Sequence, residues 1–355
     1  MSEWKTVRLG DILLIQKKSK IKASDGIENG IYPFFTCSND IVRTYNSAQY
    51  KGPALIFGTG GKASVHFCDT EFSTSTDCLT YYPVSSEINL DLVNQYIQSN
   101  IYLLENGFKG AGLKHVSRDY IANIEINLPD IKTQNCIVQK LNKAKNIISN
   151  SKKLLTKYDT LIKSRFIEMF GDKPVESGKW KVEKLEDVCD LITDGTHKTP
   201  NYQQKGIRFI SAKNIINGKI DLTDTKFITE EEYKQIQKRC RVEKNDVLLT
   251  KSGSLGSSAI IDFDIPIGLF ESLAVIKYKR NLLNGIFVKE LLSAESSQKQ
   301  FNNGVKGIAI KHLHLNVIAA LKIPIPPIKL QNDFASFVQQ IDKSKFEYTN
   351  TGAAA

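Results

Sequence analysis

Small polar and basic side chains gather in short glycine-rich segments of the sequence. The first half contains Phe57-Gly-Thr-Gly-Gly-Lys62-Ala-Ser64, and the second half contains Asp194-Gly-Thr-His-Lys198 and Thr250-Lys-Ser-Gly-Ser254. Glycine lets a backbone approach a ligand closely, hydroxyls and amides donate to phosphate oxygens, and Lys or His reaches phosphates or base edges. An ordinary turn is the alternative for any one segment. The candidates for nucleic-acid contact are Thr59, Lys62, His197, Lys198, Lys251, Ser252 and Ser254.

The sequence lacks the residues required for a phosphate loop, a metal site or a catalytic motif. A phosphate loop ending at Lys62 requires Gly at position 56 and Ser or Thr at position 63, where Ile56 and Ala63 stand. His312 and His314 are the one close histidine pair, and neither a carboxylate nor a cysteine follows at metal-ligand spacing. No Asn/Asp-Pro-Pro-aromatic methyltransferase signature and no serine nucleophile elbow is present. We therefore expect no catalytic site, metal or cofactor in this chain.

The overall composition predicts a globular protein of two domains. The chain has 355 residues, of which 41% are hydrophobic and 24% charged. No apolar stretch approaches the roughly 18 residues that span a membrane, and the N-terminus lacks the apolar run of a secretory signal. The six cysteines form no Cys-x-x-Cys pair, which is typical of reduced thiols in a cytoplasm.

The positive charge is concentrated in one segment. The chain carries a formal net charge of +10, and residues 132–170 hold nine basic residues against the two acids Asp159 and Glu168, which leaves seven of those ten charges there. The basic residues are Lys132, Lys140, Lys143, Lys145, Lys152, Lys153, Lys157, Lys163 and Arg165. Such a run indicates either a solvated helix face or a surface for nucleic acid or an acidic partner.

The sequence contains an internal repeat. Trp4-Lys-Thr-Val-Arg-Leu-Gly-Asp11 recurs in part from Trp180, and Lys109-Gly-x-x-x-Lys-His115 recurs from Lys306. Leu128-Pro-x-Ile-Lys-x-Gln-Asn135 recurs from Ile325. The first motif repeats after 176 residues and the other two after 197, so the second copy has 21 extra residues in its middle. Lys109, Lys114, Lys306 and Lys311 join the candidates for nucleic-acid contact, although they could equally cap turns.

The pattern of each copy predicts the same series of secondary-structure elements. Short apolar runs such as 54–57, 247–249 and 273–276 are broken by Gly, Pro, Asn and Ser, as strands and turns are. A proline then marks the start of a helix in both copies. The fold class predicted is therefore mixed α/β, in two globular domains.

A long helix is expected between the copies. Ile137, Leu141, Ala144, Ile148, Ser151, Leu155, Tyr158 and Ile162 alternate spacings of four and three, with Ile147, Leu154 and Leu161 beside them. Such a helix over 132–170 is about 58 Å long at 1.5 Å per residue. The corresponding helix of the second copy presents Phe334, Val338 and Ile341 but reaches only about 31 Å. The uncovered part of the stripe should meet a partner protein or a second copy of the chain, through Leu154, Leu155, Leu161 and Ile162.

These motifs, in this order and twice over, resemble the specificity (S) subunits of type I restriction-modification enzymes. The Asp194-Gly-Thr-His-Lys-Thr-Pro200 and Ile210-Ser-Ala-Lys-Asn-Ile215 segments add to the resemblance. It implies two target-recognition domains, 1–130 and 173–327, separated by an antiparallel coiled coil of a spacer helix at 131–172 and a shortened helix at 328–350, with 351–355 as a tail. A longer second helix is usual in the family.

The resemblance also implies a role and partners. An S subunit reads a bipartite site on double-stranded DNA in the prokaryotic cytoplasm and has no activity of its own. It positions methyltransferase (M) and nuclease-translocase (R) subunits, on which S-adenosylmethionine, ATP and Mg are expected. The alternative is a two-domain protein-binding adaptor without DNA specificity.

Overall fold

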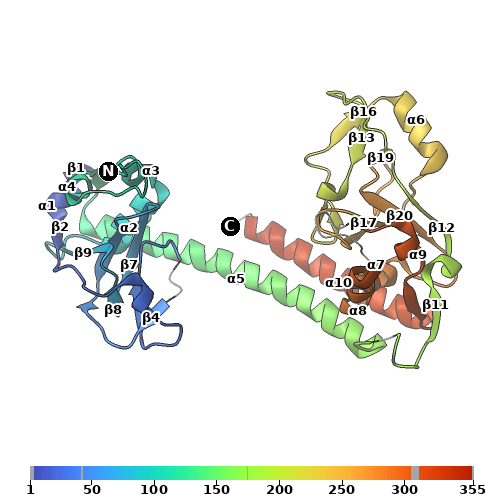
Figure 1. Ribbon diagram of the computed structural model, residues 1–355, viewed down its shortest axis with the longest axis horizontal. Helices are drawn as coiled ribbons and strands as arrows, with labels where there is room; N and C mark the ends of the chain where they lie inside the picture. Colours follow the sequence, from blue (N-terminus) through green and yellow to red (C-terminus); the bar gives the residue numbers. More distant parts are fainter. Residues whose placement is uncertain (1–3, 41–42, 174, 305–311, 354–355) are drawn as a thin grey trace. The chain divides into compact units, whose positions relative to one another are not determined.

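The computed structural model describes residues 4–40, 43–173, 175–304 and 312–353, and the chain divides into two compact units, 1–150 and 151–355. Both units combine helices with β-sheets, which confirms the mixed α/β class (Figure 1). Lys306 and Lys311, two of the candidates for nucleic-acid contact, lie outside the described residues.

The first unit is built mainly from short strands, and its last helix, α5, continues into the second unit. In chain order its elements are β1 (Lys5–Arg8), α1 (Leu9–Ile12), β2 (Leu13–Ile15), η1 (Ala23–Asp25), β3 (Tyr32–Phe35), β4 (Arg43–Tyr45), β5 (Tyr50–Lys51), β6 (Ala54–Gly58), β7 (Ser64–Cys68), β8 (Glu71–Thr74), β9 (Cys78–Pro83), α2 (Leu90–Ser99), α3 (Tyr102–Glu105), α4 (Arg118–Ala122), β10 (Glu125–Leu128) and α5 (Ile131–Phe170).

The second unit contains the end of α5, which is followed by a similar series of secondary-structure elements. Its elements are β11 (Lys181–Lys184), η2 (Leu185–Val188), β12 (Cys189–Asp194), β13 (Ile207–Ile210), η3 (Ala212–Asn214), β14 (Ile215–Ile216), β15 (Lys219–Ile220), β16 (Lys226–Ile228), α6 (Glu230–Arg239), β17 (Val247–Thr250), β18 (Ser258–Ile260), β19 (Ile267–Leu269), β20 (Leu273–Tyr278), α7 (Gly285–Ser293), α8 (Glu295–Gly304), α9 (Leu315–Ala319), β21 (Lys322–Ile325) and α10 (Ile328–Ala353).

The two units share the strand order of their main sheet. The main sheet has the order β2-β9-β6-β7 in the first unit and β12-β20-β17-β18 in the second. A second sheet contains a parallel pair in both units, β3 with β8 and β13 with β19. An antiparallel pair joins the first and last strands of each unit, β1 with β10 and β11 with β21. The repeat in the sequence is therefore a repeat of structure.

The cores lie where the central strands meet the helices. All residues of β6 and β17 are buried, as in strands covered on both faces. In the first unit Leu55 and Phe57 pack in one cluster with Val93 of α2. In the second unit Phe166 and Phe170, at the end of α5, pack in one cluster with helices α7 and α10. Burial of each such aromatic ring contributes about 1.5 to 3 kcal/mol.

Helix α10 packs antiparallel to the second half of α5 (Figure 1). Phe334 contacts Phe166 with ring centroids 5.5 Å apart, and Lys345 Nζ lies 2.7 Å from Asp159 Oδ1. Tyr348 Oη lies 3.3 Å from Ser151 Oγ. The contact positions rise along α10 as they fall along α5, so the predicted antiparallel helix pair is confirmed.

The apolar positions predicted for this helix pair differ in exposure. Ile162, Phe334 and Val338 are buried, Leu154, Leu155 and Ile341 are half-buried, and Leu141, Ile148 and Leu161 are exposed. Ile162 packs in the core of the second unit, so its side chain is already covered within the chain. No helix among the residues in 4–40, 43–173, 175–304 and 312–353 is long and apolar enough to cross a membrane.

Candidate nucleic-acid interface

Equivalent hairpins, β6-β7 in the first unit and β17-β18 in the second, carry candidate residues. Thr59 follows β6 and Lys251 follows β17, and the two residues occupy equivalent positions. The Thr59 N–H donates to the Asp77 carbonyl at 2.9 Å, and its carbonyl accepts from Val116 N–H at 3.0 Å. The Lys251 N–H donates to the Ser272 carbonyl at 2.8 Å, and its carbonyl accepts from Leu313 N–H at 2.8 Å. The residue after each Lys-His motif therefore ties down the hairpin by a main-chain bond.

In the first unit the structure brings the candidate lysines to one place. The Gly61 N–H donates to the Lys114 carbonyl at 3.0 Å, and Lys109 and His115 exchange main-chain bonds of 2.9 and 3.0 Å. The residues Lys62, Lys109 and Lys114 are exposed. Thr59 is half-buried, and its hydroxyl donates to the Asp77 carbonyl at 2.8 Å. The lysines surround the hairpin with positive charge, whereas Thr59 shapes its turn.

A cavity of about 620 Å³ opens beside this hairpin, lined in part by Lys62, Leu113 and His115. Cys37 also lines the cavity, and its Sγ lies 3.0 Å from the Asp77 carbonyl, to which the thiol donates. A hydrogen bond with the Cys78 thiol lowers the pKa of Cys37 to about 6, although burial acts in the opposite direction. Sequence reasoning missed Cys37 because no motif marks it.

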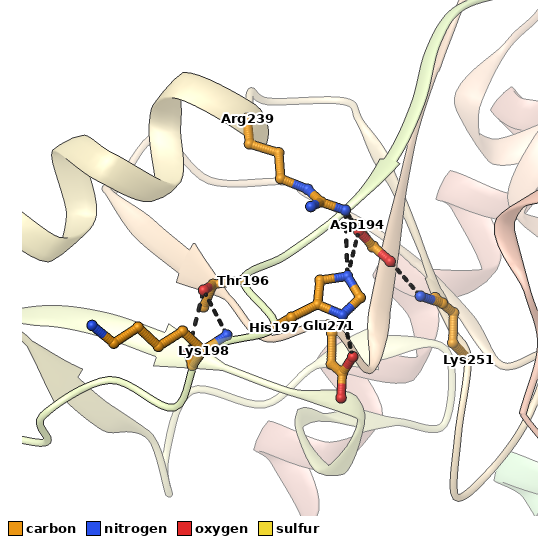
Figure 2. A network of polar contacts seen from close by, with 7 residues as sticks. All are labelled: Asp194, Thr196, His197, Lys198, Arg239, Lys251 and Glu271. Atoms are coloured by element: carbon orange, nitrogen blue, oxygen red, sulfur yellow. Dashed lines mark hydrogen bonds and ion pairs between the residues drawn. The ribbon is translucent and has the colours of Figure 1, made fainter.

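In the second unit the candidates His197 and Lys251 belong to a network of charges (Figure 2). Asp194 ends β12 and is 2% exposed. Its carboxylate accepts from the Lys251 ammonium and from Arg239 Nη2, the latter at 2.5 Å. His197 Nε2 lies 3.3 Å from Asp194 Oδ1, and His197 Nδ1 lies 2.6 Å from Glu271 Oε2. Four segments distant in the sequence thus meet around one buried carboxylate.

The electrostatics of the network hold Asp194 in its charged form. Burial acts to raise the pKa of Asp194, but the hydrogen bonds and charges of Lys251 and Arg239 outweigh it and keep that pKa below the usual value. His312 belongs to the same surroundings, and partial burial followed by the charges of Lys251 and His314 lowers its pKa. The network therefore stores a fixed pattern of charge under the Asp194-Gly-Thr-His197 turn.

The structure separates the second-unit candidates into two groups. Lys251 is 3% exposed, and its ammonium is buried against the Asp194 carboxylate. It would have to leave Asp194 to contact DNA. His197, Lys198 and Ser254 are exposed, and Ser252 is half-buried. The Thr250 hydroxyl donates to the Ser254 carbonyl and so closes the turn. Sequence reasoning missed Arg239 and Glu271, since both lie far along the chain from Asp194.

A buried glutamine in each exit motif fixes the start of the following long helix to its own unit. The Gln134 side chain accepts from Asn89 N–H at 2.9 Å and donates to the Glu87 and Pro129 carbonyls. Gln331 does the same with Asn284 N–H at 2.9 Å and with the Leu282 and Pro326 carbonyls. Asn89 and Asn284 are the N-cap residues of α2 and α7. We call Gln134 and Gln331 the glutamine clamps.

Comparison with known families decides what this duplicated architecture is. The family model of the type I restriction modification DNA specificity domain matches residues 1–157 and again residues 177–354. The chain belongs to this family. The predicted resemblance is confirmed, and the two matches together cover the first unit and most of the second.

Individual specificity subunits are similar along much of the chain. The type I restriction enzyme MjaVIII specificity subunit of Methanocaldococcus jannaschii is 22% identical over 380 residues, covering 96% of this chain and 86% of the relative. The EcoBI specificity subunit of Escherichia coli is 25% identical over 256 residues, covering 64% of this chain and 54% of the relative.

Solved structures share the fold. The type I S subunit from M. genitalium aligns with a TM-score of 0.70 at 14% identity, covering 99% of this chain and 93% of the other. A chain from a structural study of complex assembly and conformational transition in a type I system aligns with a TM-score of 0.55 at 16% identity, covering 99% and 94%. At these identities the likeness supports the fold.

Family membership fixes the general role of this specificity subunit. It is a DNA sequence-recognition protein and, like its relatives, has no catalytic activity of its own. Among the side chains that the structure describes, no group of three or more His, Cys, Asp or Glu residues could hold a metal ion.

Proposed function

We propose that this specificity subunit reads a bipartite DNA target, one half-site with each unit. The observation that carries the proposal is the duplicated hairpin with different side chains. The first unit presents Lys62 near His115, whereas the second presents His197 and Lys198 above a buried carboxylate. Two units with a similar fold but different exposed side chains suit two half-sites of different sequence. Direct readout depends on the donors and acceptors that face the base edges.

The exposed candidates divide by their expected contacts. Lys109 and Lys114 suit phosphates, which position the protein on the duplex, whereas Lys62 and Lys198 suit a phosphate or a base edge. Both ring nitrogens of His197 are engaged, Nε2 by Asp194 and Nδ1 by Glu271, so a contact with a base edge or phosphate requires the ring to release one of these carboxylates. Lys306 and Lys311, at the second copy of the Lys-His motif, stay proposed contacts by analogy with the first copy.

Replacing one reader should leave the other intact. We expect Lys62→Gln to weaken recognition of one half-site and Lys198→Gln to weaken recognition of the other, each by up to about 10-fold if one charged contact is lost. Binding of duplexes randomised in one half at a time measures the effect. Loss of base preference at both halves by either variant would contradict independent reading.

We further propose that α5 sets the length of the unread DNA between the half-sites. Inserting seven helical residues near 145–150 adds about two turns, or about 10 Å, and thus corresponds to about three base pairs. The expected result is a methylated target whose spacer is longer by that amount. Mapping methylated adenines in DNA exposed to each variant with its methyltransferase partner gives the spacer length directly. An unchanged spacer would contradict the proposal that α5 sets this length.

The catalytic steps would belong to partner subunits. We propose that M subunits with S-adenosylmethionine methylate a flipped adenine, and that R subunits supply the ATP- and Mg-dependent nuclease and translocation activity in the prokaryotic cytoplasm. The exposed Leu141, Ile148 and Leu161 of α5 are proposed contacts for a partner helix or for a second copy of the chain. An adaptor without DNA specificity would instead show duplex binding that is weak and independent of sequence.

A further inference from the structure

The second half of α5 carries four lysines that have no acidic partner among the described residues: Lys152, Lys153, Lys157 and Lys163, here called the α5 lysine patch. All four are exposed. The two acids of this half-helix are already engaged. Asp159 lies 2.7 Å from Lys345 Nζ, and Glu168 lies 2.7 Å from Arg165 Nη1. The positive charge of the patch is therefore not balanced within α5.

Three other helices of the same unit, α6, α8 and α10, each contain one lysine paired with a glutamate four positions away, namely Lys234 with Glu230, Lys299 with Glu295 and Lys343 with Glu347. Such pairs stabilise a helix, and like charges at the same spacing destabilise it. Lys153 and Lys157 form a like-charge pair of this kind. An anion supplied from outside the chain would relieve that repulsion.

The spacing of the patch fits the backbone of a nucleic acid. Lys152 and Lys163 are eleven residues apart, which is about three turns, so both lie on one face of α5. The distance along the axis is about 16 Å, close to five phosphate steps of about 3.4 Å along one DNA strand. Lys153 and Lys157 add charge on the neighbouring face.

The residue types favour DNA over an acidic protein as the anion. Lysine is depleted in protein interfaces relative to the rest of the surface, where aromatic side chains and arginine are preferred. Its compact, strongly hydrated charge on a flexible stem suits phosphates that are contacted without regard to sequence. The cations of this half-helix without an acidic partner among the described residues are all lysines, whereas its one arginine, Arg165, pairs with Glu168.

We propose that the α5 lysine patch binds the phosphates of the unread DNA between the two half-sites. This inference rests on the proposed function, in which each unit holds one half-site, and α5 joins the two units along the chain. The contact adds affinity and salt dependence but no base preference, because phosphates carry no direct sequence information.

The test compares two quadruple variants of the full chain. K152Q/K153Q/K157Q/K163Q removes the patch, and K184Q/K234Q/K299Q/K343Q removes four lysines that pair with glutamates. Binding to a duplex of about 40 base pairs that contains the mapped target is measured from about 50 to 300 mM salt. The logarithmic salt slope should fall in magnitude by about three to four for the patch variant and by less than about one for the control.

A second duplex locates the contact. Neutral methylphosphonate linkages in the unread DNA segment should lower the salt slope of binding by the parent protein. They should cause no further decrease in the salt slope of the patch variant. If the patch variant still loses slope on this duplex, the contact lies elsewhere and the proposal is wrong. Helicity of both variants, checked by circular dichroism, should match that of the parent, since glutamine favours helix nearly as well as lysine.

The remaining outcomes separate the two proposals. A parent chain that binds the mapped target specifically, with equal slopes for both variants, overturns the patch and leaves the proposed function standing. A parent chain without sequence-specific binding overturns both. A patch variant that keeps the parent salt slope but no longer associates with the methyltransferase subunit identifies an acidic protein surface instead, which also overturns the DNA contact.

Discussion

Replacing Lys251 with Met lowers the free energy of unfolding of the second unit by about 3 kcal/mol. Breaking a buried ion pair by removing one partner costs about 3 to 5 kcal/mol, because the other charge stays buried without compensation. The lower end applies here, since Arg239 still contacts Asp194 and its side chain is 55% exposed to water. Lys251 and Asp194 side chains are 4% and 2% exposed, so solvent cannot replace the lost ammonium.

Tryptophan fluorescence measures this effect in one unit. The chain has two tryptophans, and a Trp4→Phe background leaves Trp180, whose indole N–H donates to the Phe170 carbonyl at 3.1 Å in the second unit. Denaturant unfolding is then followed for K251M and for K198M as the matched control. Lys198 is exposed, so its loss should change stability by less than about 0.5 kcal/mol.

A double variant distinguishes charge from shape. D194N/K251M removes the buried carboxylate that K251M leaves without its ammonium partner, so it should regain at least half of the stability that K251M loses. Equal stability of K251M and D194N/K251M would show that the ammonium contributes through packing and would contradict the electrostatic explanation.

The same network predicts how stability depends on pH. The pKa of Asp194 in the folded chain is lowered, by Lys251 and Arg239 against the effect of burial. Its contribution is therefore present above the ordinary Asp pKa of about 3.9 and is lost as the pH falls through the lower folded value. The parent second unit should lose this part of its stability in acid, whereas D194N/K251M should lack it.

Replacing a glutamine clamp with leucine should destabilise only the unit that contains it. Gln134→Leu and Gln331→Leu each remove three hydrogen bonds and leave the three main-chain groups without their side-chain partner. At about 1 kcal/mol for each bond, the expected loss is about 3 kcal/mol. Gln134 and Gln331 are 2% and 0% exposed, so water does not replace these bonds without local opening.

Hydrogen exchange resolves the two units separately. Exchange that proceeds by local opening should accelerate by about 100-fold in α2 for Q134L and in α7 for Q331L, with the other unit unchanged. Gln139→Leu on α5 and Gln339→Leu on α10 are matched controls, because both residues are exposed on the same helices. Faster exchange in both units from one substitution would show that the clamps do not act independently.

Much of the architecture could be predicted from the repeat. The Leu-Pro-x-Ile-Lys-x-Gln-Asn motif predicted a helix after Pro129 and another after Pro327, and α5 and α10 begin at Ile131 and Ile328. The heptad spacing predicted that α5 is long, and the spacing of Phe334, Val338 and Ile341 predicted a shorter helix that packs on it, whereas the antiparallel direction followed from the family resemblance. These features depend on neighbours three to seven residues apart, so a local pattern contains them.

The sequence by itself thus determined the duplication, the long helix and the family, all of which rest on local spacing and its recurrence. Only the tertiary structure decided which candidate side chains face solvent. Lys251 and Lys62 lie in similar glycine-containing turns, yet Lys251 is buried beside Asp194 while Lys62 is exposed. The difference arises because Asp194, Arg239 and Glu271 converge from separate elements, and no local pattern records which distant charges will meet.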